Sequence, residues 1–123
     1  MIRKGFSKFS SKPTRCRAGI MHQSQLEARR CDELALMETG GLIRDVEAHP
    51  QPIYHLDVNG VHICDYKADF RYFDSERGEV VVEDTKGFMT DVARLKLKLV
   101  EAVYGISVQI VRRSHGWRAS GLR

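Results

Sequence analysis

The sequence predicts an α/β domain in which helices flank a mixed central sheet. The pair Asn59-Gly60 lies between two apolar segments of alternating pattern, which is the strongest short signal for an antiparallel hairpin. A Val-rich segment over residues 79–86 is followed by a helical pattern and by the apolar segment 106–111. A helix of this length between two strands is typical of a β-α-β unit, whose strands are parallel. Both kinds of strand pair together predict a mixed sheet.

We expect the first helix to begin after Ser24 and to run through about Glu38. Ser24 and Glu27 have the spacing of a capping box, and the following Gly40-Gly41 pair is typical of a helix end. At about 100° per residue, one side of this helix holds Leu26, Arg30, Leu34 and Met37, together with Glu27 and Glu38. A carboxylate on an apolar side is unusual, so Glu27 becomes a candidate functional residue.

Five strand segments are expected between the helices, and one after them. Those between are 42–48, 53–58, 61–66, 68–73 and 79–86, of which the first has only a loose alternation. A second helix follows Thr90 as its N-cap and ends at Tyr104-Gly105. Its apolar residues Val92, Leu95, Leu99, Ala102 and Val103 share one face, and Arg94 and Lys98 lie off that face.

The charges of the 123-residue chain are segregated along its length. The net charge is +4, from 20 Lys and Arg against 16 Asp and Glu. Six basic residues and no acid occupy residues 1–17, and four basic residues and no acid occupy 112–123, which leaves 10 − 16 = −6 between them. We therefore expect a basic arm over 1–20, one domain over 21–111 and a basic tail over 112–123. Basic ends on an acidic domain favour a nucleic acid as partner, and solubilising ends are the alternative.

Several classes of protein are disfavoured by the sequence. No apolar run approaches the roughly 20 residues of a membrane helix, and residues 1–17 lack the apolar centre of a signal peptide. The three cysteines are scattered and form no C-x-x-C pair, which favours a reduced, cytoplasmic protein over a disulfide framework or a zinc ribbon. A zinc site built from Cys31, His62 and Cys64 is also disfavoured, since their spacing is no established ligand pattern.

The chemistry of the chain is expected near the end of the 79–86 strand. Residues two apart in a strand point the same way, so Asp84 and Lys86 share a face, and Asp69 lies on the preceding strand. A short turn between these strands makes them antiparallel and brings Asp69 toward Asp84. Two carboxylates and a backbone carbonyl, here that of Thr85, are typical ligands of Mg²⁺ or Mn²⁺. A simple surface ion pair between Asp84 and Lys86 is the alternative.

At this point the chain resembles the PD-(D/E)xK nuclease superfamily. More narrowly, it is similar to a small phage and prophage family first catalogued as a domain of unknown function. The resemblance covers about residues 20–111 and rests on the order of several short motifs. They are S-x-x-E-A-x-x-x-x-E-L from Ser24 to Leu34, Q-P at Gln51, Y-x-A-D-F from Tyr66 to Phe70, E-D-x-K-G from Glu83 to Gly87, R-L-K-x-K-L from Arg94 to Leu99 and Y-G-I from Tyr104 to Ile106.

The resemblance implies a restriction-endonuclease-like fold with an αβββαβ core, and it implies a role for each matching residue. Asp69 and Asp84 correspond to metal ligands, Lys86 to the catalytic lysine, and Glu27 to a first-helix glutamate that often completes the metal site. The chain departs from the family pattern in having Ala68 before Asp69 and an aspartate rather than a glutamate at position 84. For Glu27 the capping box remains the competing role, because one carboxylate in one rotamer cannot fully serve both.

The implied activity is that of a Mg²⁺- or Mn²⁺-dependent endodeoxyribonuclease in the bacterial host of a phage or prophage. Branched DNA such as a Holliday junction is the expected substrate, and a two-site substrate would suit a symmetric homodimer. A binding module without catalysis, or an accessory subunit of a nuclease, is the alternative. Phosphate contacts are expected from Lys4, Lys8, Lys12, Arg94, Lys96, Lys98, Arg112 and Arg113.

Overall fold

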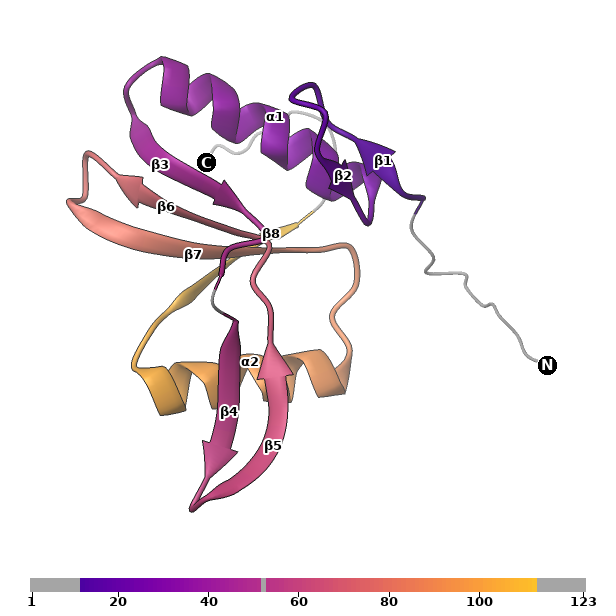
Figure 1. The fold of residues 1–123 in the computed structure, drawn as a ribbon, viewed down its shortest axis with the longest axis vertical. Helices are drawn as coiled ribbons and strands as arrows, with labels where there is room; N and C mark the ends of the chain where they lie inside the picture. The colour runs from indigo at the N-terminus through magenta and orange to yellow at the C-terminus, as the bar shows by residue number, and fades with distance from the viewer. Residues whose placement is uncertain (1–11, 52, 113–123) are drawn as a thin grey trace.

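The computed structural model describes residues 12–51 and 53–112, which form eight strands and two helices (Figure 1). The elements are β1 (Thr14–Arg15), β2 (Met21–His22), α1 (Gln25–Thr39), β3 (Ile43–Ala48), β4 (Tyr54–Val58), β5 (Val61–Tyr66), β6 (Phe70–Asp74), β7 (Glu79–Lys86), α2 (Asp91–Tyr104) and β8 (Val108–Arg112). Lys4, Lys8 and Arg113 lie outside the described residues.

The central sheet has four strands in the order β3-β6-β7-β8. Strand β6 pairs antiparallel with β3 and with β7, and β7 pairs parallel with β8 across the α2 crossover. This confirms the mixed α/β class with two flanking helices. The hairpin β4–β5 is not part of the central sheet and forms a two-stranded sheet of its own.

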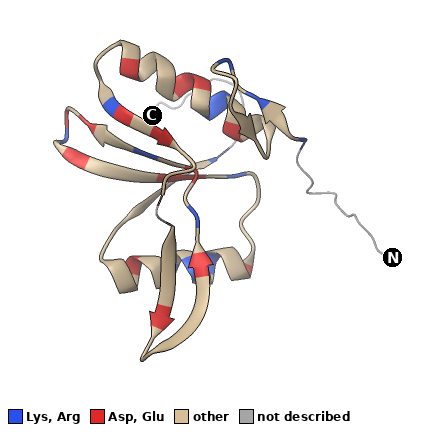
Figure 2. Cartoon of the chain, viewed as in Figure 1, with Lys and Arg blue, Asp and Glu red and all other residues tan. Residues whose placement is uncertain are grey.

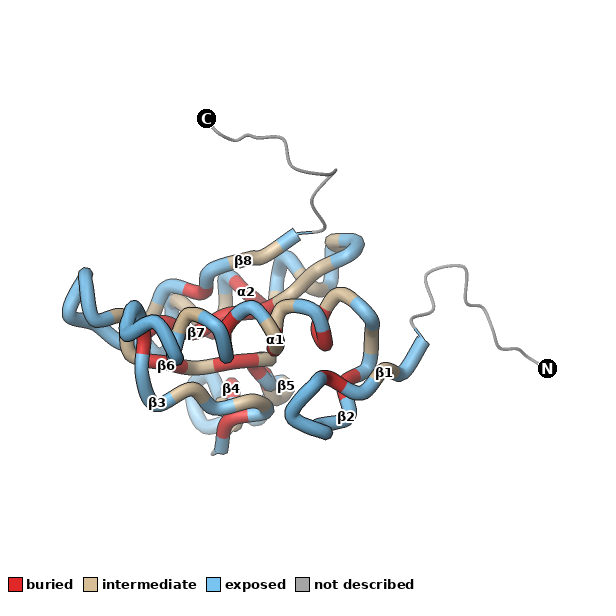
Figure 3. The backbone as a smooth tube through the Cα atoms, turned by 90° about the horizontal axis from the view of Figure 1, so that it is seen from above, coloured by how far each residue is buried: buried red, intermediate tan, exposed pale blue. Residues whose placement is uncertain are grey.

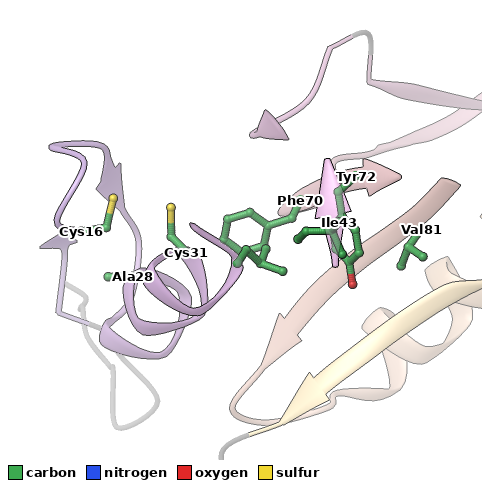
Figure 4. Packing of buried hydrophobic residues seen from close by; sticks show 8 residues of the cluster. Cys16, Ala28, Cys31, Ile43, Phe70, Tyr72 and Val81 are labelled. Atoms are coloured by element: carbon green, nitrogen blue, oxygen red, sulfur yellow. The ribbon is translucent and has the colours of Figure 1, made fainter. Parts of the chain in front are cut away.

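The two faces of the central sheet carry different layers. Helix α1 covers one face, while α2 and the β4–β5 hairpin lie on the other (Figure 1). Side chains of β6 and β7 alternate between these layers, and the buried positions gather where the layers meet (Figure 3). The α1 side buries Leu34, Ile43, Phe70, Tyr72 and Val81 with Cys16, Ala28 and Cys31 (Figure 4); the α2 side buries Leu56, Tyr66, Ala68, Val82, Leu97, Val100 and Val108.

The caps of both helices follow the sequence prediction. The side chain of Ser24 accepts a hydrogen bond from Glu27 N, and that of Thr90 accepts one from Ala93 N. Gly105 ends α2 in the left-handed conformation with φ of 68°, a conformation that favours glycine. Helices of the expected length therefore begin and end where the local signals indicate.

The apolar face predicted for α2 is not the buried one. Val92 and Leu95 are 71% and 67% exposed, whereas Leu97 and Val100 are buried against the sheet. Apolar residues occur around more than one side of this helix, so the periodicity alone did not select the contact side. Arg94 and Lys98 are exposed. Figure 2 shows the basic positions of α2 between acidic positions toward its two ends.

A second hairpin, β1–β2, lies where a basic arm was expected. It pairs Thr14 with His22 and Arg15 with Met21, and it packs on α1 with Cys16 and His22 buried. The predicted boundary between residues 20 and 21 therefore falls inside a folded element. The β4–β5 hairpin is as predicted: its turn residues Asn59 and Gly60 have φ of 52° and 80°, as a type I′ turn requires.

Within residues 12–51 and 53–112, neither helix has the length and apolar character needed to cross a membrane.

Candidate metal centre and its surroundings

The candidate site forms where β6 and β7 part. Their antiparallel register runs from Asp74 opposite Glu79 to Phe70 opposite Glu83, and it stops there. One further step in the same register would place Asp69 opposite Asp84. At this step the backbone of Asp69 still donates to Glu83 O at 3.1 Å, but its carbonyl accepts from His49 N at 2.9 Å rather than from β7. The chain before β6 thus turns away and leaves the end of β7 open on this side.

The Asp69 carboxylate accepts the hydrogen bond that the backbone of a continued β6 would have accepted from β7. Its Oδ2 accepts hydrogen bonds from Thr85 N at 2.8 Å and from Thr85 Oγ1 at 2.9 Å. A side chain here satisfies a backbone donor that a continued ladder would have satisfied. Thr85 therefore fixes the orientation of Asp69, and Asp69 in turn holds the last residues of β7.

Asp84 is buried and is held from two elements. Its Oδ2 accepts from the Tyr66 hydroxyl at 2.7 Å and lies 3.2 Å from Lys86 Nζ. Tyr66 is the last residue of β5, so the hairpin that leaves the central sheet returns a hydrogen-bond donor to the site. Asp84 and Lys86 share one face of β7, as the alternation predicted. We call Asp69, Asp84 and Lys86, with Tyr66 and Thr85, the carboxylate site.

The electrostatics of the carboxylate site reflect two acids in close proximity. Burial, together with hydrogen bonding to Asp84 and its charge, raises the pKa of Asp69 to about 8, against the lowering effect of the Thr85 backbone. Burial and the neighbouring Asp84 also raise the pKa of Tyr66, so this hydroxyl remains a donor. Without a cation, the two carboxylates are a like-charged pair whose ionisation is opposed.

Glu27 is buried at the start of α1 and belongs to the same region. Its Oε2 lies 2.9 Å from His22 Nδ1 and 3.6 Å from His49 Nε2, and its charge contributes to the raised pKa of Asp69. In the predicted capping box, the Ser24 side chain makes its hydrogen bond: Ser24 Oγ accepts from Glu27 N at 3.0 Å. The Glu27 carboxylate instead contacts the imidazoles of His22 and His49. The cap therefore does not occupy the carboxylate, whose role as a metal ligand stays a prediction.

His49 joins this region from the segment after β3. Its backbone has a φ of 54°, a conformation that non-glycine residues rarely adopt and that occurs preferentially at functional sites. Its ring lies 5.2 Å from that of His22, and one ligand atom each of His22, Glu27 and His49 fall within 4.8 Å of one another. The sequence prediction missed His22, His49 and Tyr66; only Tyr66, three residues before Asp69, lay in a recognised motif.

The opposite face of β7 carries Glu83, an acidic residue whose hydrogen bonds hold neighbouring elements together. Glu83 is 0% exposed and accepts from Arg30 Nε at 2.8 Å, Arg30 Nη2 at 2.7 Å, the Tyr72 hydroxyl at 2.6 Å and Gln109 Nε2 at 3.1 Å. It thus ties α1, β6 and β8 to the middle of the strand that bears Asp84. This network fixes β7 against its neighbours from the side away from the carboxylate site.

The predicted phosphate-binding residues lie in different places. Arg112 is exposed and stands beside Lys86 in the parallel register of β7 and β8. Arg94 and Lys98 are exposed on α2, Lys96 is half-buried there, and Lys12 is exposed before β1. The described part of the set is therefore spread over three parts of the fold, with Arg112 adjacent in register to the carboxylate site.

Comparisons with known proteins identify a family for this chain. A family model described as "Protein of unknown function (DUF1064)" matches residues 6–117, a span that includes every described helix and strand. No curated protein and no solved structure matches the chain.

Proposed function

The chain belongs to the DUF1064 family of proteins of unknown function. For this member of the family, we propose the activity of a divalent-metal-dependent endodeoxyribonuclease. The observation that carries the proposal is the carboxylate site: Asp69 and Asp84 meet at the open end of β7 beside Lys86. We further propose that the substrate is branched DNA and that Mg²⁺ or Mn²⁺ is the cofactor. The specific nuclease core, with its restriction-endonuclease-like topology, is part of the same proposal.

The donor set of the carboxylate site fits a hard divalent cation. Carboxylate oxygens are the preferred ligands of Mg²⁺, which keeps several waters and commonly takes one or two carboxylates from the protein. The raised pKa of Asp69 supports this choice, since it reflects the crowding of like charges that a cation would relieve. Asp69 and Asp84 would hold the ion, with Glu27 and the carbonyl of Thr85 as the further candidate ligands.

Each side chain of the site has a role in phosphodiester hydrolysis. Lys86 Nζ, 3.2 Å from Asp84 Oδ2, would orient the attacking water and stabilise charge on the phosphate. Tyr66 holds Asp84, and Thr85 holds Asp69, so both acids are positioned before substrate binds. A bound divalent cation supplies charge stabilisation of the phosphoryl and leaving oxygens. In-line attack of water would leave 5′-phosphate and 3′-hydroxyl ends.

The acidic character of the site calls for cationic residues that draw DNA to it. Arg112 and the exposed Arg94 and Lys98 would contact backbone phosphates, and Lys96 and Lys12 are the other described candidates. Because such contacts release counterions, binding should weaken steeply with rising salt. A symmetric homodimer would present two carboxylate sites to a branched substrate.

A cleavage assay with matched variants tests this proposal. Branched and linear DNA are incubated with the protein in Mg²⁺ or Mn²⁺, and the same assay is run with Asp84→Asn, Lys86→Met and Lys67→Met. Lys67 is an exposed lysine of the segment between β5 and β6, so its variant controls for the loss of one positive charge. We expect Asp84→Asn and Lys86→Met to lose at least 100-fold in rate, on the order of a lost charge-stabilising group, and Lys67→Met to retain activity.

Two outcomes would contradict the proposal. Cleavage that survives both Asp84→Asn and Lys86→Met would show that the reaction occurs elsewhere. An unmodified protein that binds DNA equally with and without metal and cleaves no substrate would be a binding module instead. Product ends provide a further check, since 5′-hydroxyl ends would exclude the proposed direction of attack.

A further inference from the structure

A second group of potential ligands shares His22 with the group of His22, Glu27 and His49. Cys16 of the β1–β2 hairpin, His22 of β2 and Cys31 of α1 are 6%, 1% and 8% exposed. One ligand atom from each falls within 4.8 Å of the others. Figure 4 shows the two sulfur atoms on the facing elements, with Cys16 in the hairpin and Cys31 in the helix. We call these three residues the thiol–imidazole cluster.

The imidazole of His22 has one nitrogen engaged and one left over. Nδ1 lies 2.9 Å from Glu27 Oε2, and because an ionised carboxylate only accepts, Nδ1 carries the proton in this pair. In the neutral imidazole with this tautomer, Nε2 carries the lone pair. Among the described residues it is the only buried side-chain nitrogen or oxygen without a hydrogen-bond partner. A buried acceptor without a partner is uncommon in proteins and is consistent with a missing ligand.

The arrangement of His22 and Glu27 is the one that zinc proteins use for a ligating histidine. A metal-bound imidazole typically donates its other ring N–H to a carboxylate, which fixes the tautomer and the ring orientation. Here the supporting carboxylate is buried and is itself held in place at the start of α1. Nε2 is thus the nitrogen that this pairing leaves for a metal.

The two thiols lie where a soft cation could bind them. Cys16 and Cys31 are both buried, and their ligand atoms fall in the same 4.8 Å group as a ring nitrogen of His22. The thiolate is the form of cysteine that binds a metal, and a bound cation compensates its charge.

We propose that Cys16 Sγ, Cys31 Sγ and His22 Nε2 bind a Zn²⁺ ion, with Glu27 as the positioning residue of the imidazole. Tetrahedral zinc with bonds of about 2.0–2.3 Å separates its ligand atoms by roughly 3.5–4 Å. Ligand atoms already within 4.8 Å reach that spacing by small side-chain adjustments. A water completes the fourth position, and binding releases the thiol protons.

The softness of the donors separates this site from the carboxylate site. Thiolate and imidazole favour zinc, whereas Mg²⁺ favours carboxylate and water oxygens. The zinc would fasten the β1–β2 hairpin, which has only two residue pairs, to α1. An isolated two-stranded hairpin is only marginally stable in water. A metal cross-link to α1 would therefore stabilise the β1–β2 hairpin in its packed position. The inference does not depend on the proposed nuclease function.

Cobalt spectroscopy on the full reduced chain tests the inference. Co²⁺ replaces Zn²⁺ in tetrahedral sites and reports thiolate ligands through a sulfur-to-metal charge-transfer band and intense visible bands. We expect one equivalent of Co²⁺ to produce both signals and one equivalent of Zn²⁺ to abolish them. Excess Mg²⁺ should leave them unchanged, which separates this site from the carboxylate site.

Matched variants assign the ligands. Cys16→Ser and Cys31→Ser should each lose the charge-transfer band in proportion to one thiolate, while Cys64→Ser, the half-buried thiol of β5, should retain the full spectrum. Glu27→Gln should weaken zinc binding about 10- to 100-fold while preserving the spectrum, as expected for a group that orients a ligand.

The result that would overturn the inference is a wild-type chain without the charge-transfer band at one equivalent of Co²⁺. An unchanged spectrum in both Cys16→Ser and Cys31→Ser would overturn it as well. Should these variants fail to fold, the wild-type and Cys64→Ser spectra decide: a band present in the wild type and lost in Cys64→Ser assigns the metal to another site.

Discussion

Replacing Arg30 with methionine should destabilise the fold far more than the same replacement of Arg29, the other arginine of α1. Glu83 is fully buried, and two of its four hydrogen bonds come from the Arg30 guanidinium, at 2.8 and 2.7 Å. Burial opposes the charge of Arg30, but the hydrogen bonds to Glu83 raise the pKa of Arg30. Methionine keeps the apolar stem and removes the charge, which leaves the Glu83 carboxylate buried with Tyr72 and Gln109 only.

The expected loss is about 3–5 kcal/mol in the free energy of unfolding, the usual cost of leaving one partner of a buried ion pair uncompensated. With a urea m-value of about 1.5 kcal/mol per M, the unfolding midpoint should fall by roughly 2–3 M. Arg29→Met is the matched control, because Arg29 is the exposed neighbour on the same helix and should change stability by no more than about 0.5 kcal/mol.

Urea unfolding followed by circular dichroism measures both variants under identical conditions. Adding Glu83→Gln to Arg30→Met should recover more than about 1 kcal/mol, since it removes the uncompensated charge. If Arg30→Met and Arg29→Met lie within about 1 kcal/mol of each other, the reasoning from the buried network is refuted.

Three further predictions concern the carboxylate site and the helix caps. Asp69→Asn should stabilise the metal-free protein at neutral pH: the pKa of Asp69 is raised from 3.8 to about 8, so its stabilising contribution is present below pH 3.8 and is lost as pH rises toward 8. Thermal melts in chelator from pH 4 to 8 should show this decline in the wild type and a flatter curve in the variant. Tyr66→Phe should cost about 1–3 kcal/mol by removing a donor from buried Asp84, and an unchanged urea midpoint would contradict it. Gly105→Ala should cost about 1 kcal/mol because Gly105 has a φ of 68°, whereas Gly87→Ala, also in open space but without a positive φ, should cost less in the same measurement.

Local signals explain why much of the fold could be predicted. The caps Ser24 and Thr90 and the turn Asn59-Gly60 act through hydrogen bonds and dihedral angles within a few residues. Strand alternation likewise predicted that Asp84 and Lys86 share a face. These features depend on neighbours in the chain, so the sequence contains the information needed to predict them.

The remaining features depend on contacts between distant segments. Which side of α2 is buried is decided by the sheet, and two apolar sides are compatible with its sequence. The thiol–imidazole cluster draws on the β1–β2 hairpin and on α1, with spacings that match no common motif. The divergence of β6 at Asp69 and the unusual backbone of His49 are also set by tertiary packing rather than by propensity.

The adjacent acids Glu83 and Asp84 limit where the chain can gain or lose a residue without disturbing the fold. They face opposite layers of the sheet: the Arg30 guanidinium binds Glu83, whereas the Tyr66 hydroxyl and Lys86 contact Asp84. A slip of β7 by one residue would bring Asp84 under α1 and take Lys86 away from the open end of the strand. An added residue in the turn 75–78 leaves this alignment intact, whereas an added residue between 79 and 83 requires either this slip or a β-bulge. Insertions and deletions around β7 should therefore be confined to the turn 75–78. The buried interactions of Glu83 fix the register of β7 and so the positions of Asp84 and Lys86.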